Sequence, residues 1–290
     1  MLTLPYPIKQ SISFSRTLFN LYRSAMETDE NEICFDLTRS KSLTPFGVIM
    51  LTSTIVDCFR NGKHCKLRRP ESRTLQSFLR NIGFYNFFDL KGQIAERDLI
   101  KTDTVQLRRC QGLDWEIIER LTELFNYHLN LSPGVHGSLR MSLVEAMTNV
   151  IDHSGVNDYF VCANSYRDQK LIRLCIADLG KGIRQSLKST KEYQNLTDDY
   201  DAIRQATNEG VSSRPRRAGL GLTHIKNFIK INEGQLCIIS GKGKVFWKYD
   251  HGKIMNQKME IPFPGTIVKL IINIDKEGFY FLTSEAEYIF

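Results

Sequence analysis

The sequence predicts an α+β protein: a two-layer α/β sandwich in the C-terminal part, preceded by a smaller N-terminal α/β domain. Strand-like and helix-like segments alternate between residues 31 and 90, whereas beyond residue 113 most helical segments precede a run of strands. The first pattern is typical of a small α/β layer and the second of helices packed on an antiparallel sheet. With 42% hydrophobic residues in 290, the chain can build one large core or two ordinary ones.

The N-terminal domain is expected to occupy residues 1–95, with its core at 31–90. Its elements in order are a strand at 32–37, a helix at 45–60, a strand at 64–67 and a helix at 72–82. Pro45 suits the first turn of a helix, where its missing N–H needs no partner. Gly83 stands where a C-terminal cap is expected.

Residues 96–112 are expected to be a linker, because the chain from 91 to 112 is polar, charged and weakly periodic. The second domain then occupies residues 113–275, and a C-terminal extension occupies 276–290. Residues 1–30 and 276–290 carry no recognisable motif.

The second domain reads as helices followed by an antiparallel sheet. Helices are expected at 115–129, 135–153 and 221–231, and strands at 159–166, 171–177, 235–240, 244–249 and 266–274. A long polar loop is expected between residues 182 and 218.

The composition limits the possible partners, cross-links and cellular location of the protein. The net charge of +7 makes an acidic partner worth testing, but no nucleic-acid-reading motif accompanies the basic residues, so nucleic acid is a disfavoured partner. Seven scattered cysteines without a CxxC pair argue against a disulfide framework and a structural zinc site. Neither a membrane-spanning stretch nor a secretory leader is visible, so we expect a cytoplasmic protein with no membrane partner.

Three polar residues are spaced four apart in the helix expected at 135–153. Glu145, Asn149 and His153 therefore lie along one side, and the apolar residues Leu143 and Met147 lie on the other. By itself this arrangement is typical of a solvated polar stripe.

Three glycine motifs follow in the sequence. Asp178, Gly180 and Gly182 come directly after a strand, and a GLGL motif opens a helix; the last motif is Gly265-Thr266 at the start of the final strand. Glycines let the backbone approach a ligand closely, and a helix N-terminus offers free N–H groups to a phosphate. The GLGL motif consists of Gly219, Leu220, Gly221 and Leu222.

In this order the motifs resemble the ATP-binding domain of the GHKL superfamily, which includes gyrase-type topoisomerases, Hsp90 chaperones, histidine kinases and MutL proteins. The resemblance covers residues 112–275. The ExxxNxxxH motif resembles the N box of the family, DxGxG resembles its first glycine box and GLGL its second. The resemblance implies a Bergerat fold that binds ATP and Mg²⁺.

It also implies roles for single residues. Asn149 would hold Mg²⁺, Asp178 would accept the amino group of adenine, and Thr266 would assist through a water beside the base. The glycines of the two boxes would shape the nucleotide loop. His153 matches the family position but can equally be a hydrogen-bonded residue at the end of the helix.

Glu145 is the residue that would distinguish a catalytic site from one that only binds ATP, because a carboxylate beside the metal can act as general base. The loop before the GLGL motif carries three arginines that could reach the γ-phosphate when the loop closes, or could belong to a flexible basic loop. They are Arg214, Arg216 and Arg217.

Residues 31–90 resemble a STAS domain, the α/β fold of anti-sigma-factor antagonists. The resemblance rests on the strand ICFDL, the helix start at Thr44-Pro45-Phe46-Gly47, the strand HCKL and the segment RTLQSFLRNIGF. The phosphorylated serine of such antagonists would align with Thr44 and Pro45. Proline has no hydroxyl, so a scaffold or docking role fits better than a phosphorylation switch.

We therefore expect an ATP-binding regulatory protein closest to the anti-sigma-factor and serine-kinase branch of the superfamily. It would be an ATPase or a serine/threonine kinase that acts on a protein partner through its nucleotide state. The alternatives are a slow ATPase whose lid closure drives assembly, including a homodimer, and a scaffold that binds ATP without catalysis.

Overall fold

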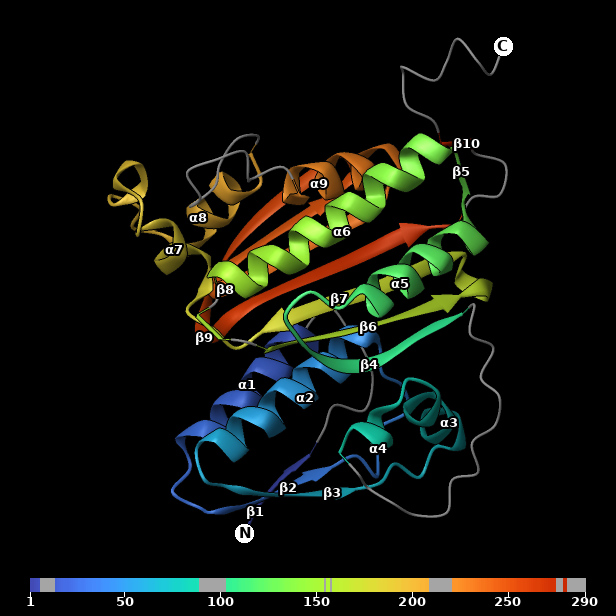
Figure 1. Cartoon of the computed structure of the whole chain (residues 1–290). Helices are drawn as coiled ribbons and strands as arrows, with labels where there is room; N and C mark the ends of the chain where they lie inside the picture. The colour runs from blue at the N-terminus through green and yellow to red at the C-terminus, as the bar shows by residue number, and fades with distance from the viewer. Residues whose placement is uncertain are drawn as a thin grey trace.

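The computed structural model describes residues 1–5, 14–88, 103–153, 155–156, 158–208, 221–274 and 279–280. The described chain is an α+β protein, as predicted. It has a three-stranded parallel sheet, a five-stranded antiparallel sheet and a pair of two-residue strands, β5 (Asn130–Leu131) and β10 (Phe279–Tyr280). In Figure 1 the two larger sheets lie on opposite sides of helices α1 and α2.

The parallel sheet has the order β1-β2-β3 and belongs to the N-terminal part. Its strands are β1 (Leu2–Pro5), β2 (Glu32–Asp36) and β3 (His64–Arg68). The helices of this part are α1 (Phe14–Glu27), α2 (Pro45–Arg60), α3 (Arg73–Asn81) and α4 (Phe84–Phe87). Pro45 is at the start of α2, as predicted, and Ser72 caps α3 by accepting the Leu75 N–H at 3.3 Å.

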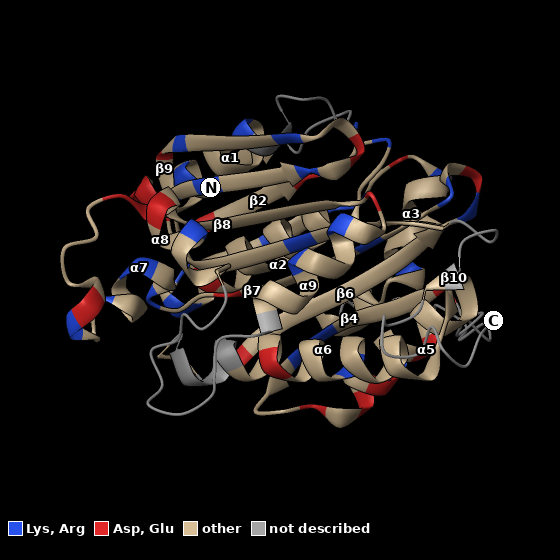
Figure 2. Cartoon of the chain, turned by 90° about the horizontal axis from the view of Figure 1, so that it is seen from above, with Lys and Arg blue, Asp and Glu red and all other residues tan. Residues whose placement is uncertain are grey.

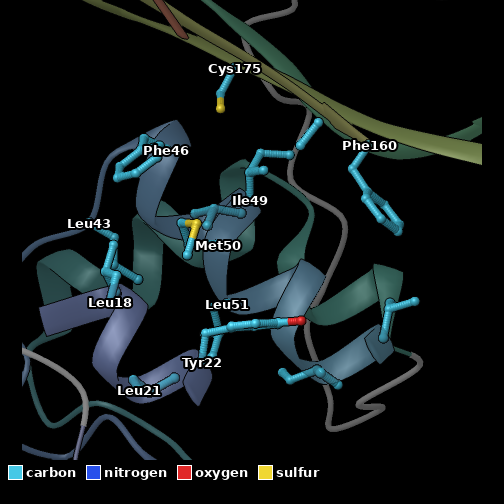
Figure 3. Close-up of a cluster of buried hydrophobic side chains, with 14 of the residues drawn as sticks. Leu18, Leu21, Tyr22, Leu43, Phe46, Ile49, Met50, Leu51, Phe160 and Cys175 are labelled. Atoms are coloured by element: carbon cyan, nitrogen blue, oxygen red, sulfur yellow. The ribbon is translucent and has the colours of Figure 1, made fainter. Parts of the chain in front are cut away.

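Helix α2 is buried on nearly all sides, with thirteen of its 16 residues inaccessible. A helix that is apolar all round must lie inside the protein, and α2 does so by packing between α1 and strands β6 and β7. In Figure 3 its residues Ile49 and Met50 lie between Leu18 of α1 and Cys175 of the large sheet.

The antiparallel sheet has the order β4-β6-β7-β9-β8. Its strands are β4 (Thr104–Gln111), β6 (Asp158–Tyr166), β7 (Leu171–Asp178), β8 (Gln235–Lys248) and β9 (Lys253–Asn273). Helices α5 (Trp115–His128), α6 (Pro133–His153) and α9 (Gly221–Ile231) cover the face turned away from α2 (Figure 1).

Strand β8 folds back on itself. The Tyr249 N–H donates to the Gly234 carbonyl at 3.1 Å, although a straight strand would hold these residues about 50 Å apart. Gly241, with φ of +56°, provides the tight turn. The two strands predicted at 235–240 and 244–249 are therefore the two arms of β8, and β9 pairs with both arms.

The structure differs from the predicted organisation in three places. Residues 104–111, expected in a linker, form the edge strand β4, which pairs with β6. The loop expected at 182–218 contains helices α7 (Gly182–Leu187) and α8 (Asp199–Ala206). Residues 1–30, in which the sequence shows no motif, contain β1 and α1, and α1 contributes Leu18 and Tyr22 to the core.

Two hydrophobic cores lie on opposite faces of the antiparallel sheet. One joins α5, α6 and α9 to the sheet, and the other joins the N-terminal elements to Phe160, Ala177, Ile239 and Ile267 of the same sheet. The N-terminal part therefore shares a core with the C-terminal sheet. No helix in the described ranges is long and apolar enough to cross a membrane.

Candidate functional site

Asp178 is a buried carboxylate at the end of β7. It is 3% exposed, and its Oδ1 accepts the Gly180 N–H at 2.8 Å. Ala177 pairs with Ile267 of β9, so the Thr266 N–H also reaches the Asp178 carboxylate. The structure thus brings together three predicted site residues that are up to 88 positions apart in the sequence.

Burial raises the pKa of Asp178 to about 7, from an ordinary value of 3.8. The N–H groups of Gly180 and Thr266 favour the charged form and lower the pKa, but desolvation outweighs them. A carboxyl with so displaced a pKa is typical of a site that binds or reacts.

Gly265 lets β9 approach this carboxylate. Its φ is +89°, and a Cβ at this position would lie 2.3 Å from the Asp178 carbonyl oxygen and 2.6 Å from both Asp178 Oδ1 and the Gly180 nitrogen. No side chain fits there, so a glycine at position 265 is a steric requirement of the contact between β7 and β9.

Gly182 begins α7 with a φ of +77°, and a Cβ on it would lie 2.8 Å from Ser240 Oγ. Ser240, on β8, is 2% exposed and connects three parts of the site. It accepts the Ile183 N–H at 2.8 Å, donates to the Gly265 carbonyl at 3.0 Å and lies 3.2 Å from Thr266 Oγ1.

Sequence reasoning missed Ser240. It ends the apolar run Leu236–Ile239 and precedes Gly241, so a polar residue at the end of a buried strand was the available signal. Its role depends on pairing with Thr266 across two strands, which no local motif reveals.

Helix α6 carries the predicted polar stripe. Leu143 and Met147 are buried, as expected for its apolar side, and Glu145 is half-buried. Asn149 and His153 lie further along the same helix. A Cβ on Gly155, just after α6, would lie 3.9 Å from Lys181 Cδ, so the end of this helix is close to the loop that follows Asp178.

Helix α9 starts at Gly221, and the half-buried Leu222 packs against the core. The other two residues of the GLGL motif, Gly219 and Leu220, lie outside the described residues, as do Arg214, Arg216 and Arg217.

Helix α9, which follows residues 209–220, is hydrogen-bonded to Thr207, which precedes them. Thr223 Oγ1 and Lys226 Nζ, on α9, donate to the Thr207 carbonyl at 3.3 and 2.9 Å. Burial lowers the pKa of Lys226.

The described residues contain no group of three or more His, Cys, Asp or Glu side chains placed to hold a metal ion. A metal at this site would need ligands of another kind, such as an amide oxygen and the oxygens of a bound ligand.

No protein-family model matches the sequence, and a search of curated proteins finds no significant match. The functional argument therefore depends on the site itself.

Proposed function

We propose that this protein binds Mg·ATP in a Bergerat-type fold of the GHKL superfamily and acts on a protein partner through its nucleotide state. The observation that carries the proposal is Asp178, a buried carboxylate with a raised pKa beside glycines whose Cβ atoms would clash. Burying a charged group is costly unless it is paired or hydrogen-bonded, and a bound ligand would give Asp178 a further partner.

Asp178 suits adenine. Its ionised carboxylate accepts the amino group of adenine, whereas guanine presents a carbonyl oxygen at the same position and would repel it. Thr266 supplies a second polar group, oriented by Ser240 at 3.2 Å. Adenine selectivity would follow from these two residues.

The phosphates would lie toward the start of α9, because the first N–H groups of a helix are unpaired and its dipole attracts anions. Asn149 of α6 would hold Mg²⁺, which bridges the phosphates and needs few protein ligands. Glu145, one turn earlier on α6, would act as general base on a water or a hydroxyl. Arg214, Arg216 and Arg217 would supply positive charge to the γ-phosphate.

The N-terminal part, which we propose is STAS-like, would serve as a docking or scaffold element. Thr44, at the position of the phosphorylated serine in the resemblance, is only 7% exposed. A kinase needs an accessible hydroxyl, so a folded chain offers little at this position. Because α2 packs on β6 and β7, a change in the sheet that carries Asp178 could be transmitted to a partner bound to the N-terminal part.

The test is calorimetric titration with ATP and Mg²⁺ on the wild type and on Asp178→Asn. We expect the variant to lose about 10- to 100-fold in affinity, since a hydrogen bond to a charged group contributes about 1.5–3 kcal/mol. Glu145→Gln is the matched control, because it should retain ATP and lose turnover or transfer. Equal affinities in the wild type and Asp178→Asn would refute the adenine role.

A further inference from the structure

The first arm of β9, residues 253–258, is an edge strand with an open side. In the described part of the chain it pairs only with residues 243–248 of β8. All of its residues are exposed, including two apolar ones, Ile254 at 58% and Met255 at 45%. An edge strand with unpaired N–H and C=O groups is a template for another strand.

The edge is cationic. Residues 243–258 contain four lysines and one acidic residue, Asp250. Figure 2 shows Lys and Arg near the β9 label, with Asp and Glu beside them near the α8 label. Of the lysines, Lys248 Nζ lies 5.1 Å from the centre of the Phe246 ring and Lys258 Nζ lies 3.9 Å from Asp198. Lys253 and Lys258 stand at the two ends of the open strand.

A cavity of about 120 Å³ lies beside this strand, between it and α1. Phe19, Met259 and Ile261 supply apolar surface to it, and Lys244 supplies positive charge. Glu260 also lines the cavity but is paired with Arg16 at 3.1 Å. Because a cavity of about 150 Å³ can hold benzene, this one suits a single aliphatic side chain such as Val or Leu.

We propose that this edge binds an extended acidic segment of a partner protein by strand addition. The partner strand would pair with residues 253–258, place its carboxylates near Lys253 and Lys258, and insert one aliphatic side chain into the cavity. Main-chain hydrogen bonds would give affinity, and the cavity and the lysines would give specificity. The surface contains none of the proposed nucleotide-binding residues, so it can be tested without ATP.

A second copy of this chain is a poorer occupant. In an antiparallel self-pairing about the middle of the strand, the lysines of both copies would gather at its two ends, with Lys253 of one copy within one residue of the position opposite Lys258 of the other. Like charges gathered in this way destabilise a sheet. An acidic segment converts the same positions into attractive pairs.

The experiment uses the full chain and short fluorescent peptides of about eight residues, the length of a typical added strand. Because Lys253 and Lys258 are five positions apart and lie on opposite faces of the strand, the first peptide carries two Glu five positions apart with Val and Leu between them. A second peptide replaces Glu by Lys, and a third keeps Glu but replaces Val and Leu by Ser. In fluorescence anisotropy we expect the first to bind at least about tenfold more tightly than the others, and to weaken as salt is raised.

The double variant Lys253→Glu with Lys258→Glu should reverse the preference and bind the lysine peptide. Its control is Lys41→Glu with Lys230→Glu, which changes two exposed lysines on other parts of the chain and should keep the acidic preference. Equal binding of the peptides, an unchanged preference in the edge variant, or dimerisation of the wild type that the edge variant abolishes would overturn the proposal.

Discussion

Among the side chains of the site, Asp178 has the most unusual environment. A carboxyl that is 3% exposed and has a pKa of about 7 is close to half-protonated at neutral pH. The fold tolerates it because the Gly180 and Thr266 N–H groups satisfy its oxygens in part. Its cost in stability can be measured without a ligand.

That cost predicts a stability gain in Asp178→Asn. The carboxyl binds a proton more tightly in the folded chain than in the unfolded one, where its pKa is near 3.8. The free energy of unfolding should therefore fall as pH rises from about 4 to about 7, and the loss is complete above that range. In urea unfolding, the free energy of unfolding of the variant should exceed that of the wild type by about 4 kcal/mol at pH about 8, and by little at pH about 4. An unchanged pH dependence in the variant would contradict the assignment.

Gly265→Ala should be far more damaging than an ordinary glycine substitution. A Cβ there meets the Asp178 carbonyl oxygen at 2.3 Å, whereas Gly252, also at positive φ, has nothing within 4 Å. Gly252→Ala should cost about 1 kcal/mol from backbone strain alone, and Gly265→Ala at least about 2 kcal/mol more. Thermal or urea unfolding of the two variants measures the difference. Similar losses would mean that β7 and β9 do not approach as closely as described.

Helix α2 determines how the elements stack. Its apolar surface is too broad for contact with one layer, and the structure places it between α1 and the antiparallel sheet. The sequence predicted the helix and its start at Pro45, because both are local properties. It did not predict the second packing partner, because a buried helix can face either a helix or a sheet.

Two residues of α2 provide a matched pair of substitutions. Ile49 is fully buried and Phe59 is 51% exposed. Ile49→Ala should reduce the free energy of unfolding by about 2–4 kcal/mol, because it removes buried atoms from the core that α2 shares with α1 and the sheet. Phe59→Ala, which deletes more atoms, should cost less than about 1 kcal/mol. Denaturant midpoints of the two variants test the order, and a larger loss for Phe59→Ala would refute the packing.

Strand β4 shows why the predicted linker contained an element. Its sequence, TVQLRRCQ, holds two adjacent arginines and reads as polar. The structure uses both in ion pairs: Arg108 with Glu116 at 2.7 Å and Arg109 with Asp158 at 2.5 Å. Partners that lie outside the strand leave no pattern within it, whereas the periodic segments α5 and α9 were predicted within one residue of their ends.

The whole molecule is held together across the predicted boundary. Asp158, which begins β6, accepts hydrogen bonds from Arg60 of α2 at 2.9 Å and from Arg109 of β4 at 2.5 Å. The same β6 residue is only 6% exposed, so its two cationic partners satisfy a buried charge. The N-terminal elements thus contribute both apolar contacts and charge to the sheet.

This continuity predicts that the C-terminal part is not stable alone. A fragment of residues 103–290 would expose the sheet face formed by Phe160, Cys162, Ala177, Ile239 and Ile267, all nearly inaccessible in the full chain. Large exposed apolar patches promote association between protein molecules. We expect the fragment to aggregate or to bind an apolar dye, and co-expression with residues 1–102 to restore a soluble complex. A monomeric 103–290 fragment that unfolds cooperatively, with the midpoint of the full chain, would show instead that the two parts are independent domains. The shared core and the paired Asp158 argue for the first outcome, because each half completes a surface that the other leaves open.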